Sequence, residues 1–188
     1  MTITRDTAMQ LLKDYSKRGD IIVRHGLAVE AAMRAYATKF GGDPEYWGIA
    51  GLVHDFDWDV CPTPEEHPTF GANILKDKGF PEDIIRAVLT HGEHTGIERI
   101  NIMEKTLFAV DELTGFVVAV ALVRPSKSLE DTKVSSVKKK FKDKAFAKGV
   151  IREDIFKGSQ ELGVELDDHI AFIIEALKPV ATQLGLNP

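Results

Sequence analysis

The amino-acid sequence predicts an all-α fold, and three observations lead to this prediction. Apolar residues recur every three to four positions over most of the 188-residue chain, which is the period of an α-helix. No two segments show the apolar–polar alternation that is typical of paired β-strands. Glycines and prolines fall between the periodic segments, where they end one helix or begin the next. We therefore expect one compact helical domain over residues 1–188.

Five helices are expected in the first half of the chain, and glycine and proline mark most of their ends. Gly19, Gly41 and Gly79 follow periodic segments, and glycine readily adopts the left-handed conformation found at helix C-termini. Asp43 followed by Pro44 is typical of a helix start, because the carboxylate caps free amides and proline suits the first helical position. The expected helices are 5–17, 21–40, 45–55, 69–78 and 81–91.

Four more helices are expected in the second half of the chain. A long apolar helix must end before Pro125, because the residue that precedes a proline disfavours the helical conformation. A loop at 126–136 separates this helix from shorter amphipathic ones. Pro179 is expected to kink the last helix, since proline has no backbone N–H to donate. The expected helices are 102–122, 137–148, 152–162 and 166–184.

The composition predicts a cytoplasmic protein without a membrane anchor. The N-terminal residues are polar and lack the apolar stretch of a signal peptide. The longest apolar run, 113–123, holds 11 residues, whereas a membrane-spanning helix needs about 20. The single cysteine, Cys61, excludes an internal disulfide and a thiolate-rich zinc site. The net charge of −5 argues against nucleic acid as a partner.

Three histidines and one aspartate lie on apolar faces of four different predicted helices. His25 and His91 have apolar neighbours three and four positions away, and His54 follows small residues at that spacing. Asp111 lies in the middle of the most apolar helix, although an aspartate is almost never fully buried unless it is paired. A metal ion would balance the carboxylate charge and accept a lone pair from each neutral imidazole. A lone histidine of this kind is usually a core residue, so the metal-site prediction rests on the convergence of all four.

The order of these residues resembles the signature of the HD-domain superfamily of metal-dependent phosphohydrolases. His25, the adjacent pair His54 and Asp55, and then Asp111 follow the H…HD…D pattern of that superfamily. The paired His-Asp is the most specific element of the pattern. The resemblance implies that these four side chains ligate a divalent metal inside an all-helical fold.

A second set of histidines resembles superfamily members that bind two metals. The segment HPTFGANIL, which begins at His67, is similar to their HPxxGxxIL segment, and His91 is similar to their next ligand. The resemblance implies a second metal, with Asp55 as the bridge. The same two histidines could instead bind substrate phosphate, and His67 could simply begin its helix. Two departures leave these interpretations open. The glycine-tyrosine-proline signature of the cyclic-dinucleotide phosphodiesterases is absent, and Ile21 stands where some of those enzymes carry a glutamate ligand.

Four other polar residues are given lesser roles. His94 is expected to be either a solvated loop residue or a group that contacts a ligand side chain or donates a proton. Asp57 and Asp59 are expected to cap a turn or to hydrogen-bond to the ligands rather than to bind metal. His169 lies beside two aspartates at the start of the last helix and is expected at the surface.

The lysine-rich segment 137–149 has two interpretations. The first is a solvated amphipathic helix that is held by its apolar residues. The second is a rim that attracts the phosphate of a substrate, with Lys138, Lys139 and Lys142 among its cations. No base-reading motif accompanies these lysines, which again argues against nucleic acid.

The resemblance implies a metal-dependent phosphohydrolase that cleaves a phosphomonoester or phosphodiester of a small, nucleotide-like substrate with metal-activated water. Nitrogen and oxygen ligands suit Fe, Mn, Co, Ni, Zn or Mg, at one or two ions per chain. The resemblance covers about residues 20–122, so residues 123–188 are expected to form a helical C-terminal extension. Two alternatives stay open: a mixed-valent di-iron oxygenase of the same superfamily, and a non-catalytic regulatory or binding module that contains the metal.

Overall fold

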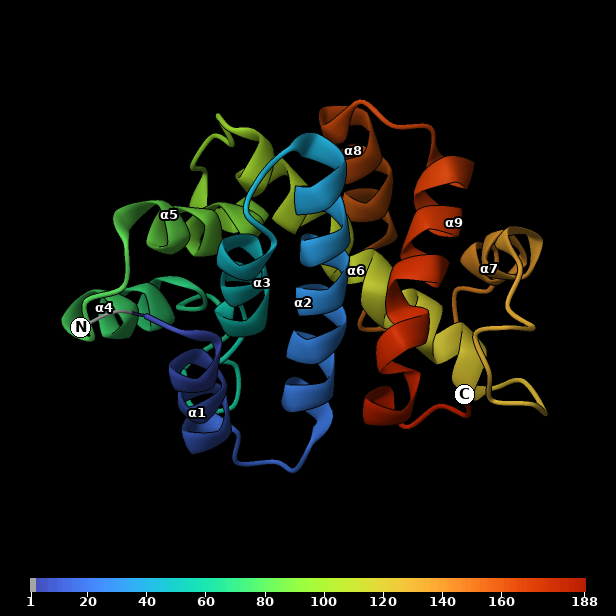
Figure 1. Cartoon of the computed structure of the whole chain (residues 1–188), viewed down its shortest axis with the longest axis horizontal. Coiled ribbons are helices and arrows are strands. Elements are labelled where there is room, and N and C mark those ends of the chain that lie inside the picture. The colour runs from blue at the N-terminus through green and yellow to red at the C-terminus, as the bar shows by residue number, and fades with distance from the viewer. Residues whose placement is uncertain (1–2) are drawn as a thin grey trace.

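The computed structural model describes residues 3–188, and that part of the chain contains nine α-helices, two 3-10 helices and no β-strand (Figure 1). The α-helices are α1 (Arg5–Tyr15), α2 (Ile21–Phe40), α3 (Pro44–Val53), α4 (Thr69–Asp77), α5 (Glu82–His91), α6 (Ile102–Leu122), α7 (Val134–Phe141), α8 (Arg152–Leu162) and α9 (Leu166–Leu177). The 3-10 helices are Glu93–Thr95 and Lys178–Leu184. The all-α prediction is confirmed. None of these helices is long and apolar enough to cross a membrane.

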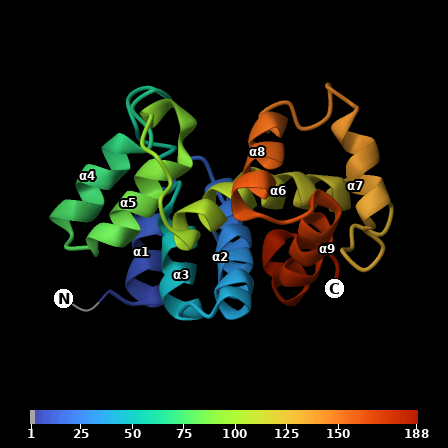
Figure 2. The ribbon, with the colours of Figure 1, turned by 90° about the horizontal axis from the view of Figure 1, so that it is seen from above.

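Helix α2 is the central element, and both α3 and α6 pack against it (Figures 1 and 2). The chain reverses direction between α2 and α3, where Asp43 accepts hydrogen bonds from the amides of Glu45 and Tyr46 and so caps α3. Helices α4 and α5 lie at one end of the molecule, and α7 lies at the other end (Figure 2). This arrangement brings the middle of α6 alongside the start of α2 and the end of α3.

Two glycines let α2 and α3 approach each other closely. A Cβ atom on Gly51 of α3 would lie 3.0 Å from the carbonyl oxygen of Val29, and a Cβ atom on Gly26 of α2 would lie 3.0 Å from that of Leu52. Both distances are shorter than ordinary contacts with a carbon atom, so a larger residue at either position would push the helices apart. The close packing fixes the positions of the helix ends that carry the histidines.

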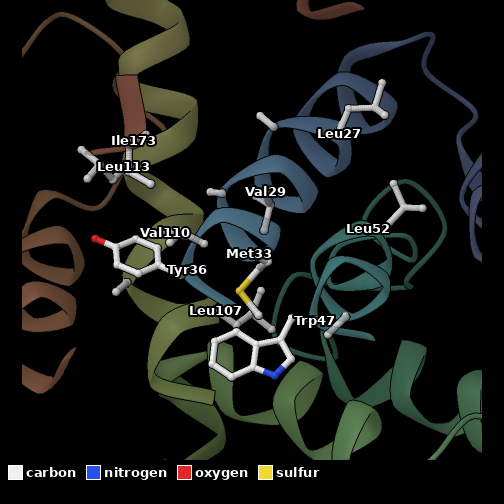
Figure 3. Packing of buried hydrophobic residues seen from close by; sticks show 14 of the residues in the cluster. Leu27, Val29, Met33, Tyr36, Trp47, Leu52, Leu107, Val110, Leu113 and Ile173 are labelled. Carbon is white, nitrogen blue, oxygen red and sulfur yellow. The ribbon is translucent and has the colours of Figure 1, made fainter. Parts of the chain in front are cut away.

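The apolar core lies between α2, α3 and α6 and extends to α9 (Figure 3). Met33 and Val29 of α2 are fully buried in it, and each large apolar side chain contributes about 1.5–3 kcal/mol by leaving water. The other labelled members in Figure 3 are Leu27, Tyr36, Trp47, Leu52, Leu107, Val110, Leu113 and Ile173. Because this core holds α6 against α2, it also fixes the polar residues at its edge.

Helix α7 differs most from its prediction. The predicted helix was 137–148. Helix α7 begins three residues before residue 137 and ends seven residues before residue 148, so its first turn lies in the predicted loop. Asp143 accepts a hydrogen bond from the amide of Ala145, and Arg152 donates to the carbonyl oxygens of Asp143 and Phe146. These local side-chain bonds compete with helical hydrogen bonds, so the chain turns where its periodicity would have continued the helix.

The last predicted helix, at 166–184, is divided in two. Helix α9 ends at Leu177, and the residues after it form a 3-10 helix rather than a kinked α-helix. Pro179 has no N–H to donate to the carbonyl of Glu175, which explains the change of hydrogen-bond pattern. The other helices begin and end within two residues of their predictions.

The prediction that His169 lies at the surface is wrong. Its side chain is fully buried between α9, α2 and α6. Nε2 donates to the carbonyl oxygen of Ala109 at 2.9 Å, and Nδ1 therefore accepts from the hydroxyl of Tyr36 at 2.6 Å. His169 shares a face of α9 with Ile173 and Leu177, and this helical spacing outweighs its two acidic neighbours. Burial lowers the pKa of His169 to about 4, so the ring is neutral at pH 7.

Candidate metal centre

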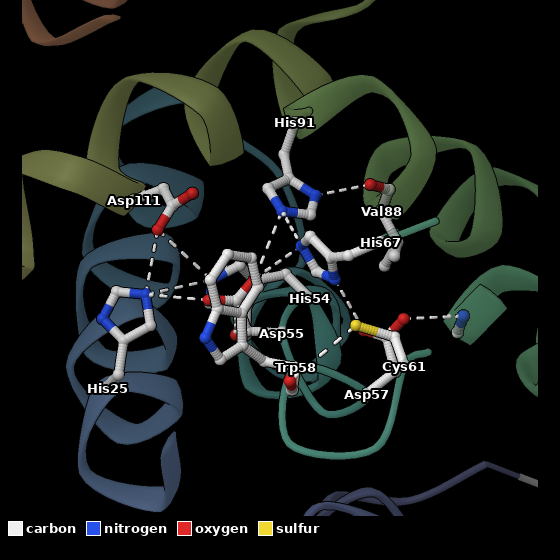
Figure 4. Close-up of polar contacts among 12 residues, drawn as sticks. His25, His54, Asp55, Asp57, Trp58, Cys61, His67, Val88, His91 and Asp111 are labelled. Atoms are coloured by element: carbon white, nitrogen blue, oxygen red, sulfur yellow. Dashed lines mark hydrogen bonds and ion pairs between the residues drawn. The ribbon is translucent and has the colours of Figure 1, made fainter. Parts of the chain in front are cut away.

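Four side chains converge where α2, α3 and α6 meet (Figure 4). His25 projects from α2 and Asp111 from the middle of α6, while His54 and Asp55 directly follow α3. Nε2 of His25 lies 2.9 Å from Oδ1 of Asp111, 3.1 Å from Nε2 of His54 and 3.5 Å from Oδ2 of Asp55. One potential ligand atom from each of these four residues therefore faces a common point. We call the four residues the first cluster.

A second cluster, formed by Asp55, His67 and His91, lies next to the first. His67 lies two residues before α4 and His91 ends α5, and their Nε2 atoms are 3.1 Å apart. Oδ1 of Asp55 lies 3.1 Å from Nε2 of His67 and 3.3 Å from Nε2 of His91. Its other oxygen, Oδ2, lies 3.4 Å from Nε2 of His54 in the first cluster. The two oxygens of one carboxylate thus face two separate groups of nitrogen atoms.

The hydrogen bonds of the ring nitrogens favour a cation within these clusters. Nδ1 of His54 donates to the carbonyl oxygen of Gly51 at 2.8 Å, and Nδ1 of His67 donates to Asp57 at 2.8 Å. Nδ1 of His91 likewise donates to a backbone carbonyl. A neutral imidazole that donates through Nδ1 presents a lone pair at Nε2, so unshared pairs face one another across each cluster. Nitrogen and carboxylate oxygen are donors that divalent metals bind, and the residues present therefore fit such an ion.

The charges of the two aspartates dominate the electrostatics of the clusters. Burial alone would lower the pKa of His54, but the charges and hydrogen bonds of Asp55 and Asp111 outweigh it and raise that pKa well above 6.5. Burial likewise opposes ionisation of Asp55 and Asp111, but His54 and the other histidines hold both pKa values below the usual range. The pKa of His67 rises to about 9, since its bonds to Asp55 and Asp57 outweigh burial. The site therefore favours positive charge.

The first cluster is open to solvent on one side. The side chains of His25, Asp55 and Asp111 are 20%, 17% and 17% exposed, whereas the other three histidines of the two clusters are 5% exposed or less. Solvent therefore contacts the centre at His25, Asp55 and Asp111. The protein encloses the remaining sides.

Asp57 holds the second cluster in place without joining it. Its side chain is fully buried, and its two oxygens accept from Nδ1 of His67 and from the amide of Gly71, both at 2.8 Å. Asp59 instead accepts from two backbone amides after α1. His94 is exposed, and its Nε2 donates to the carbonyl oxygen of His67. Asp57 and His94 therefore orient His67 from opposite ends of the residue.

The lysine-rich segment lies away from both clusters. Helix α7 packs against α6 and α9, at the end of the molecule opposite α4 and α5 (Figures 1 and 2). Lys138 pairs with Asp167 at 2.7 Å, and together with Lys139 and Lys142 it borders a partly apolar groove between α7 and α9. Among the ion pairs of residues 3–188, none joins these lysines to the clusters. The phosphate-rim interpretation thus gains no support from their position and stays a prediction.

Two residues beside the clusters were not singled out from the sequence. Trp58 is 43% exposed, and its ring stands nearly perpendicular to that of His67 with the ring centroids 4.9 Å apart. Glu112 follows Asp111, and burial together with the negative charge of Asp111 raises its pKa to about 8. The available signals were a tryptophan three residues after Asp55 and a second acid in the apolar helix.

Comparison with known proteins agrees with the geometry of the clusters. A family model described as HD domain matches residues 22–116, which is just over half of the chain. The matched region contains every residue of both clusters. No curated protein and no solved structure matches the chain. On the strength of the family match and the clusters that lie within it, the chain belongs to the HD domain family.

Proposed function

We propose that this chain is a metal-dependent phosphohydrolase that cleaves a phosphomonoester or phosphodiester of a nucleotide-like substrate. The observation that carries the proposal is the convergence of the first cluster on one point with an open side. Membership of the HD domain family supports the reaction class, because the superfamily is typified by metal-dependent phosphohydrolases. Family membership supports the reaction class, and the nucleotide-like substrate is proposed in addition to it.

The four residues of the first cluster would hold a divalent ion, and the fold holds them in turn. The ion would lower the pKa of a coordinated water molecule and would polarise a phosphoryl oxygen. His54 is oriented by its bond to the carbonyl of Gly51, so its Nε2 faces the other ligand atoms. Asp111 is fixed by the packing of α6 on α2, and its partly exposed carboxylate lies at the open side. Substrate phosphate would approach from that side.

The second cluster would give the phosphate a further contact or accommodate a second ion. Nε2 of both His67 and His91 lies within 3.3 Å of the Asp55 oxygen that faces away from the first cluster. A second ion there would share Asp55 with the first. With one ion only, Nε2 of the same two side chains would donate hydrogen bonds to a phosphate oxygen when each ring is protonated at both nitrogens. Both arrangements use the orientation that Asp57 imposes on His67.

A screen of phosphoesters with several divalent metals, combined with elemental analysis of the protein, tests the proposal. We expect turnover that requires metal and is lost in the Asp55→Asn and Asp111→Asn variants. Asp77→Asn is the matched control, since Asp77 is an exposed aspartate at the end of α4. Retention of full turnover by both cluster variants would contradict the proposal. Failure of the metal-loaded chain to hydrolyse any phosphoester would also contradict it.

The shared carboxylate also favours a second candidate, a mixed-valent di-iron oxygenase. Such an enzyme needs two ions close together, and Asp55 faces two groups of ligand atoms. Aerobic purification with iron and electron paramagnetic resonance would test this candidate. Two irons per chain, a mixed-valent signal and no phosphoester turnover would favour it. Bound metal with neither signal nor turnover would instead indicate a regulatory or binding module.

A further inference from the structure

An exposed indole stands at the edge of the candidate metal centre. Trp58 is 43% exposed, whereas the only other tryptophan, Trp47, is 7% exposed and packs in the core. Large aromatic side chains are usually buried because they carry much apolar area. Its ring lies 4.9 Å from that of His67, centroid to centroid, and in the view of Figure 4 it is drawn between His25 and His67. The exposed indole therefore lies next to a candidate ligand residue.

The backbone on both sides of Trp58 is held firmly. The preceding residue, Asp57, is fully buried and bonded to His67 and Gly71. The following residue, Asp59, has a side chain only 3% exposed and accepts hydrogen bonds from two amides of the chain after α1. The amide of Trp58 itself donates to the carbonyl oxygen of Asp55 at 3.0 Å. An exposed ring on an anchored backbone is preorganised for contact with a ligand.

Part of the indole surface is open to solvent. Its one aromatic neighbour among residues 3–188 is His67, and those two rings meet at an interplanar angle of 84°. In a perpendicular pair the edge of one ring meets the face of the other, so His67 does not stack on the indole. No cation lies over the indole among the described residues. The same ring thus contacts a residue of the second cluster and exposes part of its apolar surface to solvent.

We propose that Trp58 binds a planar aromatic ring of the substrate by stacking while the substrate phosphate occupies the clusters. This inference rests on the proposed phosphohydrolase function and narrows its substrate class to phosphoesters that carry a nucleobase or another aromatic group. Indole and aromatic rings prefer offset stacking, and every nucleobase has a π-face that can stack. An aliphatic phosphoester of equal size would reach the clusters but would lack this contact.

A matched pair of phosphonates tests the inference without hydrolysis. Benzylphosphonate and cyclohexylmethylphosphonate are similar in size and charge, and their C–P bonds are not phosphoester bonds. Titration calorimetry on the metal-loaded chain should show about tenfold tighter binding of the benzyl compound, which corresponds to about 1.4 kcal/mol. In the Trp58→Leu variant the two compounds should bind equally, and Trp58→Phe should restore part of the preference.

Phe156→Leu is the matched control, because Phe156 is an exposed aromatic residue of similar exposure, 42%, that lines the groove beside α7. It should leave the benzyl preference unchanged. Metal content and circular dichroism of each variant establish that the ions and the fold are retained. Tryptophan fluorescence is a second readout of benzylphosphonate binding, and the chain has only the tryptophans Trp47 and Trp58. A fluorescence change on binding that is lost in Trp58→Phe would be assigned to Trp58.

Several results would overturn the inference. These are equal affinities of the two phosphonates for the unaltered chain, a benzyl preference that survives Trp58→Leu, and failure of both compounds to bind. A chain that hydrolyses phosphoesters but shows no benzyl preference would retain the proposed function and lose this inference. A chain that shows the preference but hydrolyses no phosphoester would lose the proposed function and retain the aromatic site.

Discussion

Lowering the pH from 7.5 to 5 should destabilise the fold by about 2 kcal/mol through His169 alone. Burial lowers the pKa of this histidine from 6.5 to about 4 in the folded chain. As the pH falls below 6.5, the unfolded chain takes up a proton at His169 that the folded chain cannot accept. The stabilisation is therefore complete above pH 6.5 and is lost on acidification at about 1.4 kcal/mol per pH unit. Over about 1.5 units, from pH 6.5 to 5, the loss reaches about 2 kcal/mol.

Urea unfolding of the unaltered chain and of His169→Gln, at both pH values, measures this loss. Chelator is present throughout so that metal release does not contribute to the difference. Glutamine keeps a donor and an acceptor but does not titrate, so it should weaken the contacts to Tyr36 and Ala109 by the same amount at each pH. The stability gap between the two proteins should narrow by about 2 kcal/mol at pH 5. An equal loss of stability in both proteins on acidification would refute the reasoning.

Three other predictions follow from the clusters and from the packing of α6. Chelator should lower the melting temperature of the metal-loaded chain, because an ion at a concentration about 1,000-fold above Kd stabilises the fold by about 4 kcal/mol. An unchanged transition would count against a buried site. If two ions bind, the double variant His67→Ala, His91→Ala should retain one of them in elemental analysis, and loss of both ions would show that the two sites are not separable. Gly158→Ala should destabilise the fold by about 1–3 kcal/mol, since its Cβ would lie 2.6 Å from Cα of Ala109. Gly115→Ala is the control, because its Cβ would lie 3.8 Å from His25, and an equal effect of the two substitutions on chemical denaturation would contradict the packing argument.

The helices were largely predictable because their ends carry local signals. Capping by Asp43 and the glycine after α2 are encoded within a few residues, and so α2 and α3 begin and end close to their predicted positions. The end of α7 depends instead on Arg152, which reaches back to carbonyl groups six and nine residues earlier. Such a contact has no signature in helical periodicity. The predicted helix at 137–148 was therefore too long.

The candidate ligands were identifiable because charged side chains on apolar faces need a partner. That argument selects His25 and Asp111 but fixes no distance between them, since they lie 86 residues apart and meet through the packing of α2 on α6. The orientation of Asp57 toward His67 was even less accessible, because the turn after α3 has no periodicity from which a direction follows. The position of Trp58 beside His67 could not be predicted for the same reason, since Trp58 lies in the same turn. An exposed aromatic residue gains meaning only when its neighbours in space are known.

The central claim is that the first cluster is a ligand set for one divalent ion. Anomalous diffraction from a crystal of the metal-loaded chain, recorded at the absorption edge of the bound metal, tests it most directly. The account predicts a peak at about 2.0–2.3 Å from ligand atoms of His25, His54, Asp55 and Asp111, and a neighbouring peak beyond Asp55 if a second ion binds. A crystal saturated with metal whose anomalous peaks all lie away from these four residues would contradict it.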